Sequence, residues 1–544
     1  MSIVIPKDMR GFGFTDLALV DLNDIDVDRM LPQLWELIVK RGRLSATPRG
    51  AEEYERHLDA LSIASHLRGF DDAQGKKVLD GWLRSSIVQM GAKGRDKSGT
   101  QLLYIRPLTI ASYRASLPKT RRNRNADILI YKLLLEEMER RHVEASEENL
   151  EKKLQAAVGT GITIGLKGDW LPAYDGTSDI DVNALLSLYF LEGFPEMRGP
   201  KPPKYHYAGS AVPSATQGLA NDLLDFLVTY GGQLPAAAFV DRFAALISLR
   251  LFQLPLRVAR VARHVLTTGE ASEDMRDDNA PNPLELYCDF TRVRGSASDE
   301  LSRQCVQRDM EITRGFLYDR LLLRSLQEAL DMLDDEGTRI KALPMADRLV
   351  ELVALRENPL LSAYATMKMQ SIRAETNKAG DTEDDVELIA EIMRQKSPAV
   401  DRLTAMLVEG IGEIGLKNQV KWFWNTGGIV KPYGLLTGSV NSRRSWRYAP
   451  SDDLLNALLL TCFTKRNNPR PKTRMTIKDL LQELERRFGI LIDRPPADFD
   501  SADNRATAAA NLEAFKRRLQ LLGCFDGLSD DFSAQHVRNP VEMA

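Results

Sequence analysis

Apolar residues recur at helical spacing along most of this chain, and this periodicity limits the fold more than any other feature. The stretch 28–41, with Asp28 placed to cap it, has one apolar helical face made of Met30, Leu31, Leu34, Leu37 and Ile38. Similar patterns predict further helices at 51–67, 73–90, 126–141, 182–192, 216–230, 235–252, 256–266, 298–335, 345–356 and 384–396. The sequence therefore predicts a mainly α-helical, multidomain fold with a few short strands.

Glycine and proline divide the chain into three predicted regions. With 544 residues, the chain is long enough for several domains. Residues 1–155 are predicted as a helical domain with a basic loop at 93–124. Residues 160–400 form a mainly helical centre, in one or two subdomains. Residues 415–544 begin with an interrupted stretch, Lys421 to Pro450, predicted as loop, turn or short strand.

Two details of the central region are also predicted. Leu284 to Thr291 is the best isolated strand candidate. Gly337 is placed to end the long helix that begins at Ser298.

The end of the chain has the pattern of a winged-helix-like module. Ser451 to Asp453 can cap a helix that reaches Phe463, and Thr476 can cap a second helix that Gly489 stops. A third helix is predicted at 503–522 and a short hairpin at 524–537. Helices followed by a terminal hairpin predict such a module, and both DNA binding and protein docking are open to it.

Charge is distributed unevenly along the chain. The whole sequence has a net charge of −3, but residues 415–475 have +9 and residues 93–124 have +8, which leaves −20 on the rest. The pattern predicts an acidic body with two basic surfaces.

The basic window 417–475 also contains three of the six tryptophans. Lysine and arginine neutralise phosphates, and aromatic rings stack on bases or sugars, so this mixture favours a nucleic acid. The alternative to nucleic-acid binding is that the charged side chains of the window are simply solvated. For any single tryptophan, burial in the core is the favoured interpretation. The predicted nucleic-acid contacts are Lys417, Lys421, Trp422, Trp424, Lys431, Arg443, Arg444, Trp446, Arg447, Arg470, Lys472, Arg474, Lys516, Arg517, Arg121, Arg122 and Arg124.

Asp179 and Asp181 provide an enzyme alternative. Their DxD spacing resembles the Ser-Asp-x-Asp element of nucleotidyltransferases, in which paired carboxylates hold magnesium. The sequence departs from that pattern, because no Gly-Ser pair precedes it and a helix is predicted where a strand is required. A helix cap made by Asp179 or Asp181 is the favoured interpretation, and a nucleotidyltransferase or a nuclease is the alternative.

Other motifs predict neither a cofactor nor a metal. Gly410 to Gly415 has the letters GxGxxG but follows a predicted helix, whereas a dinucleotide site needs a preceding strand. The four cysteines form no CxxC pair, which predicts reduced thiols in the cytoplasm, and the six histidines are isolated. No apolar run approaches the length of a membrane span, and no export signal is expected.

Part of the C-terminal quarter resembles a known family. The segments are Lys431–Gly438, Arg443–Pro450, Phe488–Pro496 and Asn511–Asp531. They are similar to large components of bacterial anti-phage defence islands, most of all the large subunit of the methylation-associated defence system. The resemblance implies action beside a methyltransferase, a specificity subunit, a kinase and ATPases against phage DNA. It transfers no catalytic residue.

Together these patterns predict a non-catalytic, DNA-binding subunit of a defence or DNA-processing complex. Two alternatives stay open at this point: a metal-dependent enzyme that uses Asp179 and Asp181, and a protein-interaction scaffold that does not bind DNA.

Overall fold

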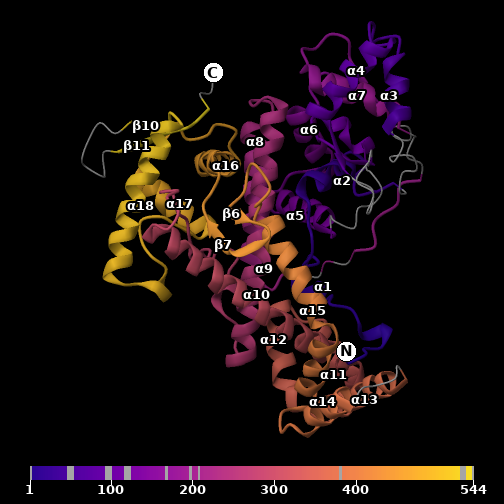
Figure 1. Cartoon of the computed structure of the whole chain (residues 1–544), viewed down its shortest axis with the longest axis vertical. Helices are drawn as coiled ribbons and strands as arrows, with labels where there is room; N and C mark the ends of the chain where they lie inside the picture. The colour runs from indigo at the N-terminus through magenta and orange to yellow at the C-terminus, as the bar shows by residue number, and fades with distance from the viewer. Residues whose placement is uncertain are drawn as a thin grey trace.

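Helices make up most of the protein, as the sequence predicts (Figure 1). The computed structural model describes residues 3–45, 54–91, 101–115, 124–165, 170–194, 199–205, 207, 209–378, 383–526 and 535–541. Within these ranges the strands are short and form sheets of two or three strands. None of the helices in these ranges has the length and apolar character needed to cross a membrane.

The N-terminal part packs around helix α2 (Val27–Val39), whose residues Leu34 and Trp35 are fully buried. Helix α5 (Ala126–Arg140) lies against it, and Figure 1 shows both on the right-hand side of the molecule. The other elements of this part are α1 (Thr15–Ala18), α3 (Tyr54–Ser62), α4 (Ala73–Trp82), β1 (Val88–Gly91), β2 (Gln101–Ile105), α6 (Ser146–Val158), β3 (Ile162–Ile164), β4 (Pro172–Tyr174) and α7 (Val182–Glu192).

Three long helices form the centre: α8 (Pro213–Tyr230), α9 (Ala236–Thr268) and α10 (Ala297–Ala329). Helices α9 and α10 have 33 residues each, so each is about 50 Å long. The prediction of two helices within 235–266 was wrong, because α9 passes through Pro255 without a break. Pro255 is buried between neighbouring elements, and their packing offsets the backbone hydrogen bond that proline cannot donate.

A group of shorter helices follows at the bottom of Figure 1: α11 (Asp334–Lys341), α12 (Met345–Ala354), α13 (Pro359–Lys378) and α14 (Glu383–Arg394). Gly337 lies inside α11 and does not end a helix, contrary to the prediction. A Cβ atom at Gly337 would lie 2.0 Å from the carbonyl oxygen of Leu330, so this position requires glycine because the two turns approach each other closely.

Helix α15 (Ala399–Thr426) is longer than the sequence suggests. Residues 421–426 were predicted as loop or short strand, but they continue the helix because Trp422 and Phe423 extend its buried face. The helix therefore crosses residue 415, where a region boundary was predicted. Gly410 and Gly415 lie within α15, where a Cβ atom would collide with Ile5 and Phe12 respectively, so these glycines permit close packing of the N-terminal segment.

The C-terminal part begins with the antiparallel hairpin β6 (Leu436–Ser439) and β7 (Ser442–Tyr448). The elements that follow are α16 (Asp452–Phe463), β8 (Arg474–Thr476), α17 (Ile477–Phe488), β9 (Ile490–Leu491), α18 (Ala502–Leu521), β10 (Phe525–Asp526) and β11 (His536–Arg538). The predicted caps of α16 and α17 are confirmed: Ser451 and Thr476 accept backbone hydrogen bonds, and Gly489 ends α17 with φ of 60°. Strands β10, β11 and β8 form one sheet in that order.

The C-terminal part is joined to the centre through buried polar contacts. Strand β5 (Leu286–Tyr287), a short version of the predicted strand, pairs in parallel with β9. The buried Asn511 of α18 accepts a hydrogen bond from the Phe290 amide at 2.8 Å and donates to the carbonyl oxygens of Cys288 and Ile492. The buried apolar residues of all three parts belong to one connected core.

Candidate nucleic-acid interface

Two of the three tryptophans in the basic window are core residues. Trp422 and Trp446 are each 1% exposed. The Trp446 ring is stacked on Phe423, with centroids 6.0 Å apart and planes at 9°, and Trp422 donates a hydrogen bond to the Leu251 carbonyl oxygen at 3.2 Å. Protein atoms cover both rings, so neither presents a face to a nucleobase. Trp424 is half-buried.

Two predicted cationic contacts are bound within the protein. Lys431 pairs with Asp26 at 3.0 Å and with Asp28 at 2.5 Å. Burial disfavours its charged form, but these two carboxylates outweigh burial and raise the pKa of Lys431 above its ordinary value. Arg447 pairs with the fully buried Asp299 at 2.9 Å. These side chains hold the fold together and have little surface left for a ligand.

Two more predicted contacts have carboxylate partners. Arg124 pairs with Asp24 at 2.7 Å, and Lys516 pairs with Glu513 at 2.7 Å. Arg517 is exposed on α18, next to Lys516. Arg121 and Arg122 lie outside the described residues.

The segment 465–474, called the linker here, exposes all of its basic side chains. It connects α16 to β8 and contains no acidic residue. The Lys472 amide donates to the Phe463 carbonyl oxygen at 2.8 Å, and the Asn539 amide donates to Thr473 at 2.9 Å, so the backbone is held in place. The exposed cations are Lys465, Arg466, Arg470, Lys472 and Arg474. Among the described residues only Arg466 forms an ion pair, with Glu137 at 3.1 Å.

A polar cavity of about 400 Å³, the linker cleft, lies between the linker and helices α8, α9 and α17. Its ionisable lining has more cations than anions. Within this lining, Asp222 forms ion pairs with Arg250 and Arg487, and Glu483 forms one with Arg486. The cations are Arg250, Arg257, Lys465, Arg466, Lys472, Arg486 and Arg487. The carboxylates are Asp222, Asp225, Asp278 and Glu483.

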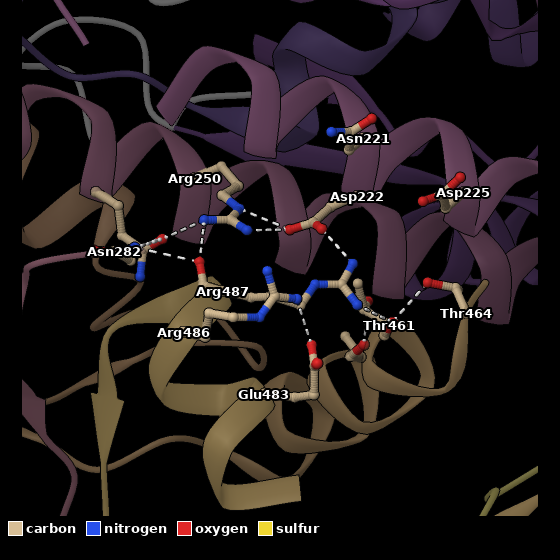
Figure 2. Close-up of polar contacts among 12 residues, drawn as sticks. Asn221, Asp222, Asp225, Arg250, Asn282, Thr461, Thr464, Glu483, Arg486 and Arg487 are labelled. Atoms are coloured by element: carbon tan, nitrogen blue, oxygen red, sulfur yellow. Dashed lines mark hydrogen bonds and ion pairs between the residues drawn. The ribbon is translucent and has the colours of Figure 1, made fainter. Parts of the chain in front are cut away.

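Asp222 lies at the centre of the contacts in Figure 2 and joins three helices. It accepts hydrogen bonds from Arg250 of α9, one of them at 2.9 Å, and from Arg487 of α17. Arg487 also donates to the Thr461 carbonyl oxygen at 2.7 Å. Burial opposes ionisation of Asp222, but the two guanidinium groups outweigh it and lower the pKa of Asp222 below its ordinary value. This group therefore fastens the C-terminal part to the centre.

A second cavity, called the hairpin pocket here, is also lined by residues predicted to contact nucleic acid. It has a volume of about 210 Å³ and lies between α10, α15 and strand β7. It brings together Lys417 and Arg443, which are distant in the sequence, and adds Arg314 of α10. Arg443 and Arg444 are exposed, and among the described residues no carboxylate forms an ion pair with either. Lys421 is exposed one turn after Lys417, which pairs with Glu413 at 2.6 Å.

The walls of the hairpin pocket are mostly apolar, and its most unusual member is Gln419. The walls contain Met310, Leu416, Val420 and Phe423. Gln419 also lines the pocket and is 1% exposed, yet neither Oε1 nor Nε2 has a hydrogen-bond partner among the described residues. No charge run or motif marks Gln419 in the sequence, so sequence reasoning did not identify it.

Asp181 caps a helix, as the favoured interpretation of its motif predicts. Its carboxylate accepts hydrogen bonds from the amides of Asn183 at 2.9 Å and Ala184 at 3.1 Å, at the start of α7. Asp175 accepts from Ser178 in the preceding turn, and these contacts lower the pKa of Asp175 to about 2. Asp179 is exposed. Within the described ranges, no three His, Cys, Asp or Glu side chains cluster closely enough to hold a metal ion.

The comparisons with known proteins extend the resemblance beyond the C-terminal quarter. The family described as methylation-associated defense system protein MAD7 matches residues 7–541, nearly the whole chain. No curated protein and no solved structure matches the chain.

Proposed function

Because the chain belongs to the family of methylation-associated defense system protein MAD7, we propose that it is the DNA-binding, non-catalytic subunit of an anti-phage defence complex. The observation that carries this proposal is the linker, which exposes five basic side chains and contains no acidic one. Such a segment suits a polyanion, because each phosphate contact releases condensed counterions.

The anchoring of the linker supports a binding role. Its backbone is held by hydrogen bonds to Phe463 and Asn539, so its cations project from a fixed base. A fixed base lowers the entropy lost when the side chains engage phosphates. The exposed Arg443 and Arg444 of the hairpin supply further positive charge.

The topology of the C-terminal part supports a winged-helix module. The order is helix α16, strand β8, helices α17 and α18, and strands β10 and β11, with β11 in the middle of the sheet. In this arrangement α18 takes the place of the recognition helix. One of its faces packs on the centre through Asn511 and Phe515, and Arg517 lies on the exposed face.

We further propose that the acidic remainder of the chain contacts the other subunits of the system. A methyltransferase, a specificity subunit or an ATPase are the partner classes that membership of a defence system suggests. Co-purification of the full chain with each candidate subunit tests this, and no retained partner in any pairing contradicts it.

A salt titration of duplex binding tests DNA binding directly. We expect the logarithm of the association constant to fall steeply with the logarithm of salt concentration. Replacing Lys465, Arg470 and Lys472 together by Ala should reduce that slope by about 3. The matched control replaces three exposed cations at or just after the ends of α13 and α14, Lys378, Arg394 and Lys396, and should leave the slope unchanged.

Two results would overturn the proposal. One is an absence of duplex binding at low salt, which would leave a protein-interaction scaffold as the function. The other is an equal loss of slope in both triple variants, which would mean that the linker has no special part in binding.

A further inference from the structure

We propose that the hairpin pocket receives one unpaired nucleobase of the bound nucleic acid. The inference rests on the proposed function, because the base belongs to the strand whose phosphates the basic surfaces hold. It adds a second kind of contact: phosphates position a nucleic acid, whereas contacts to bases can distinguish one nucleotide from another.

The size and walls of the pocket suit one planar ring system. Its volume of about 210 Å³ is below the roughly 300–1,000 Å³ typical of sites for drug-sized molecules. Met310, Leu416, Val420 and Phe423 supply apolar surface that can cover the faces of a base.

The aromatic residues behind the pocket hold one of these walls in place. Phe423 is packed between Trp446, which is stacked on it, and Trp422, whose ring plane stands at 83° to it. The tryptophans therefore contribute to the pocket from behind, although their own rings are covered. Because this wall is already fixed, binding of a ligand does not lose the entropy of ordering the Phe423 side chain.

Gln419 lies in the pocket wall, and its amide donor and acceptor are buried without partners among the described residues, so a base reaches them only when this side chain turns toward the pocket. A buried amide without partners is costly, so a ligand that supplies both partners relieves that cost. Nucleobase edges present a donor beside an acceptor, and a glutamine side chain can bind such an edge with two hydrogen bonds. A purely apolar ligand would leave the Gln419 amide unsatisfied.

The rim of the pocket has the charge that a nucleotide requires. Arg314, Lys417 and Arg443 line it together with one carboxylate, Glu413. Arg314 forms an ion pair with Glu311 at 2.8 Å and Lys417 with Glu413 at 2.6 Å, whereas Arg443 has no ion pair among the described residues. A base inside the pocket places its own phosphates near this rim. A base that is already unpaired needs no energy to leave a duplex, so single-stranded DNA is the expected ligand of the pocket.

The test compares two single-stranded oligodeoxynucleotides of equal length and charge, one with bases and one made of abasic sugar phosphates. The full chain should bind the base-bearing strand at least about tenfold more tightly. Gln419→Leu should remove most of this preference while the weaker binding of the abasic strand is kept. Leu416→Phe should do the same by narrowing the pocket, whereas Ile414→Phe, on the exposed face of α15, should not.

The outcomes separate this inference from the proposed function. Equal, salt-sensitive binding of both strands overturns the nucleobase pocket and supports the proposed function. A base preference that survives in both Gln419→Leu and Leu416→Phe also overturns the pocket, provided that thermal unfolding shows both variants folded. No binding of either strand, together with no binding of duplex, contradicts the proposed function as well.

Discussion

The linker cleft and the hairpin pocket differ in how their polar groups are satisfied. In the cleft, the buried carboxylate of Asp222 is matched by Arg250 and Arg487, so the polar groups stabilise one another. In the pocket, the buried amide of Gln419 has no partner among the described residues. The exposed linker cations Lys465 and Lys472, which also line the cleft, form no ion pair among the described residues, whereas in the pocket the unpartnered group is a buried amide. Charge content alone therefore does not locate a binding site, because paired charges serve the fold.

Asp222→Ala should give the largest effect and would show that the buried ion pairs of the cleft are structural. The variant leaves the buried guanidinium group of Arg250 and the partly buried one of Arg487 without their carboxylate, so the free energy of unfolding should fall by about 3–5 kcal/mol. Urea unfolding followed by circular dichroism measures this. Glu483→Ala removes a carboxylate of the same cleft whose partner, Arg486, is 59% exposed, and should cost less than about 1 kcal/mol. An equal fall in the free energy of unfolding for both variants would contradict the distinction between buried and exposed ion pairs of the cleft.

Substitutions of the arginines in strand β7 should give the next largest change in stability. They compare an arginine that pairs with a buried carboxylate with two exposed arginines of the same strand. Arg447→Ala removes a partner of the buried Asp299, so the free energy of unfolding should fall by about 1–3 kcal/mol. Arg443→Ala with Arg444→Ala should change it by less than about 0.5 kcal/mol. The double variant should instead reduce the salt slope of DNA binding by about 2. If the double variant is destabilised and its salt slope of DNA binding is unchanged, Arg443 and Arg444 serve the fold and do not contact DNA.

Gln419→Leu should have a smaller effect of opposite sign. Leucine has a similar volume and removes the unsatisfied amide, so the free energy of unfolding should rise by about 1 kcal/mol. Thermal and urea unfolding measure the gain, with Gln253→Leu as the comparison. Gln253 is buried but donates a hydrogen bond to the Phe488 carbonyl oxygen at 2.5 Å, so its loss should be destabilising. A destabilised Gln419→Leu would mean that the amide serves the fold.

The pH dependence of stability should give the smallest effect. The folded protein lowers the pKa of Asp222 below the unfolded value of about 3.9, so the unfolded state binds more protons in acid. The contribution of Asp222 is therefore fully present above about pH 4 and is lost as pH falls through its folded pKa. The difference in unfolding free energy between wild type and Asp222→Asn should shrink on acidification. A difference that stays constant from about pH 5 to pH 2 would contradict the role of this carboxylate.

Local signals predicted much of the fold. Ser451, Thr476 and Gly489 define the ends of their helices, because capping depends on residues next to each other in the chain. The sequence did not predict that α9 continues through Pro255 or that α15 continues to Thr426. In both cases packing against elements distant in the sequence outweighs a local helix-breaking signal. The spacing of apolar residues along the sequence does not reveal such packing.

For the candidate site, the sequence by itself determined the composition of the basic window and its contrast with an acidic remainder. Only the tertiary structure decided which of those side chains face outward: it placed Trp422, Trp446 and Lys431 inside and left Arg443 and the linker exposed. The physical reason is that a charged or aromatic side chain has the same chemistry in the core and on the surface. Its role depends on the residues that the fold places around it. Gln419 shows this most clearly, because an ordinary residue gains significance when the fold buries its amide without a partner.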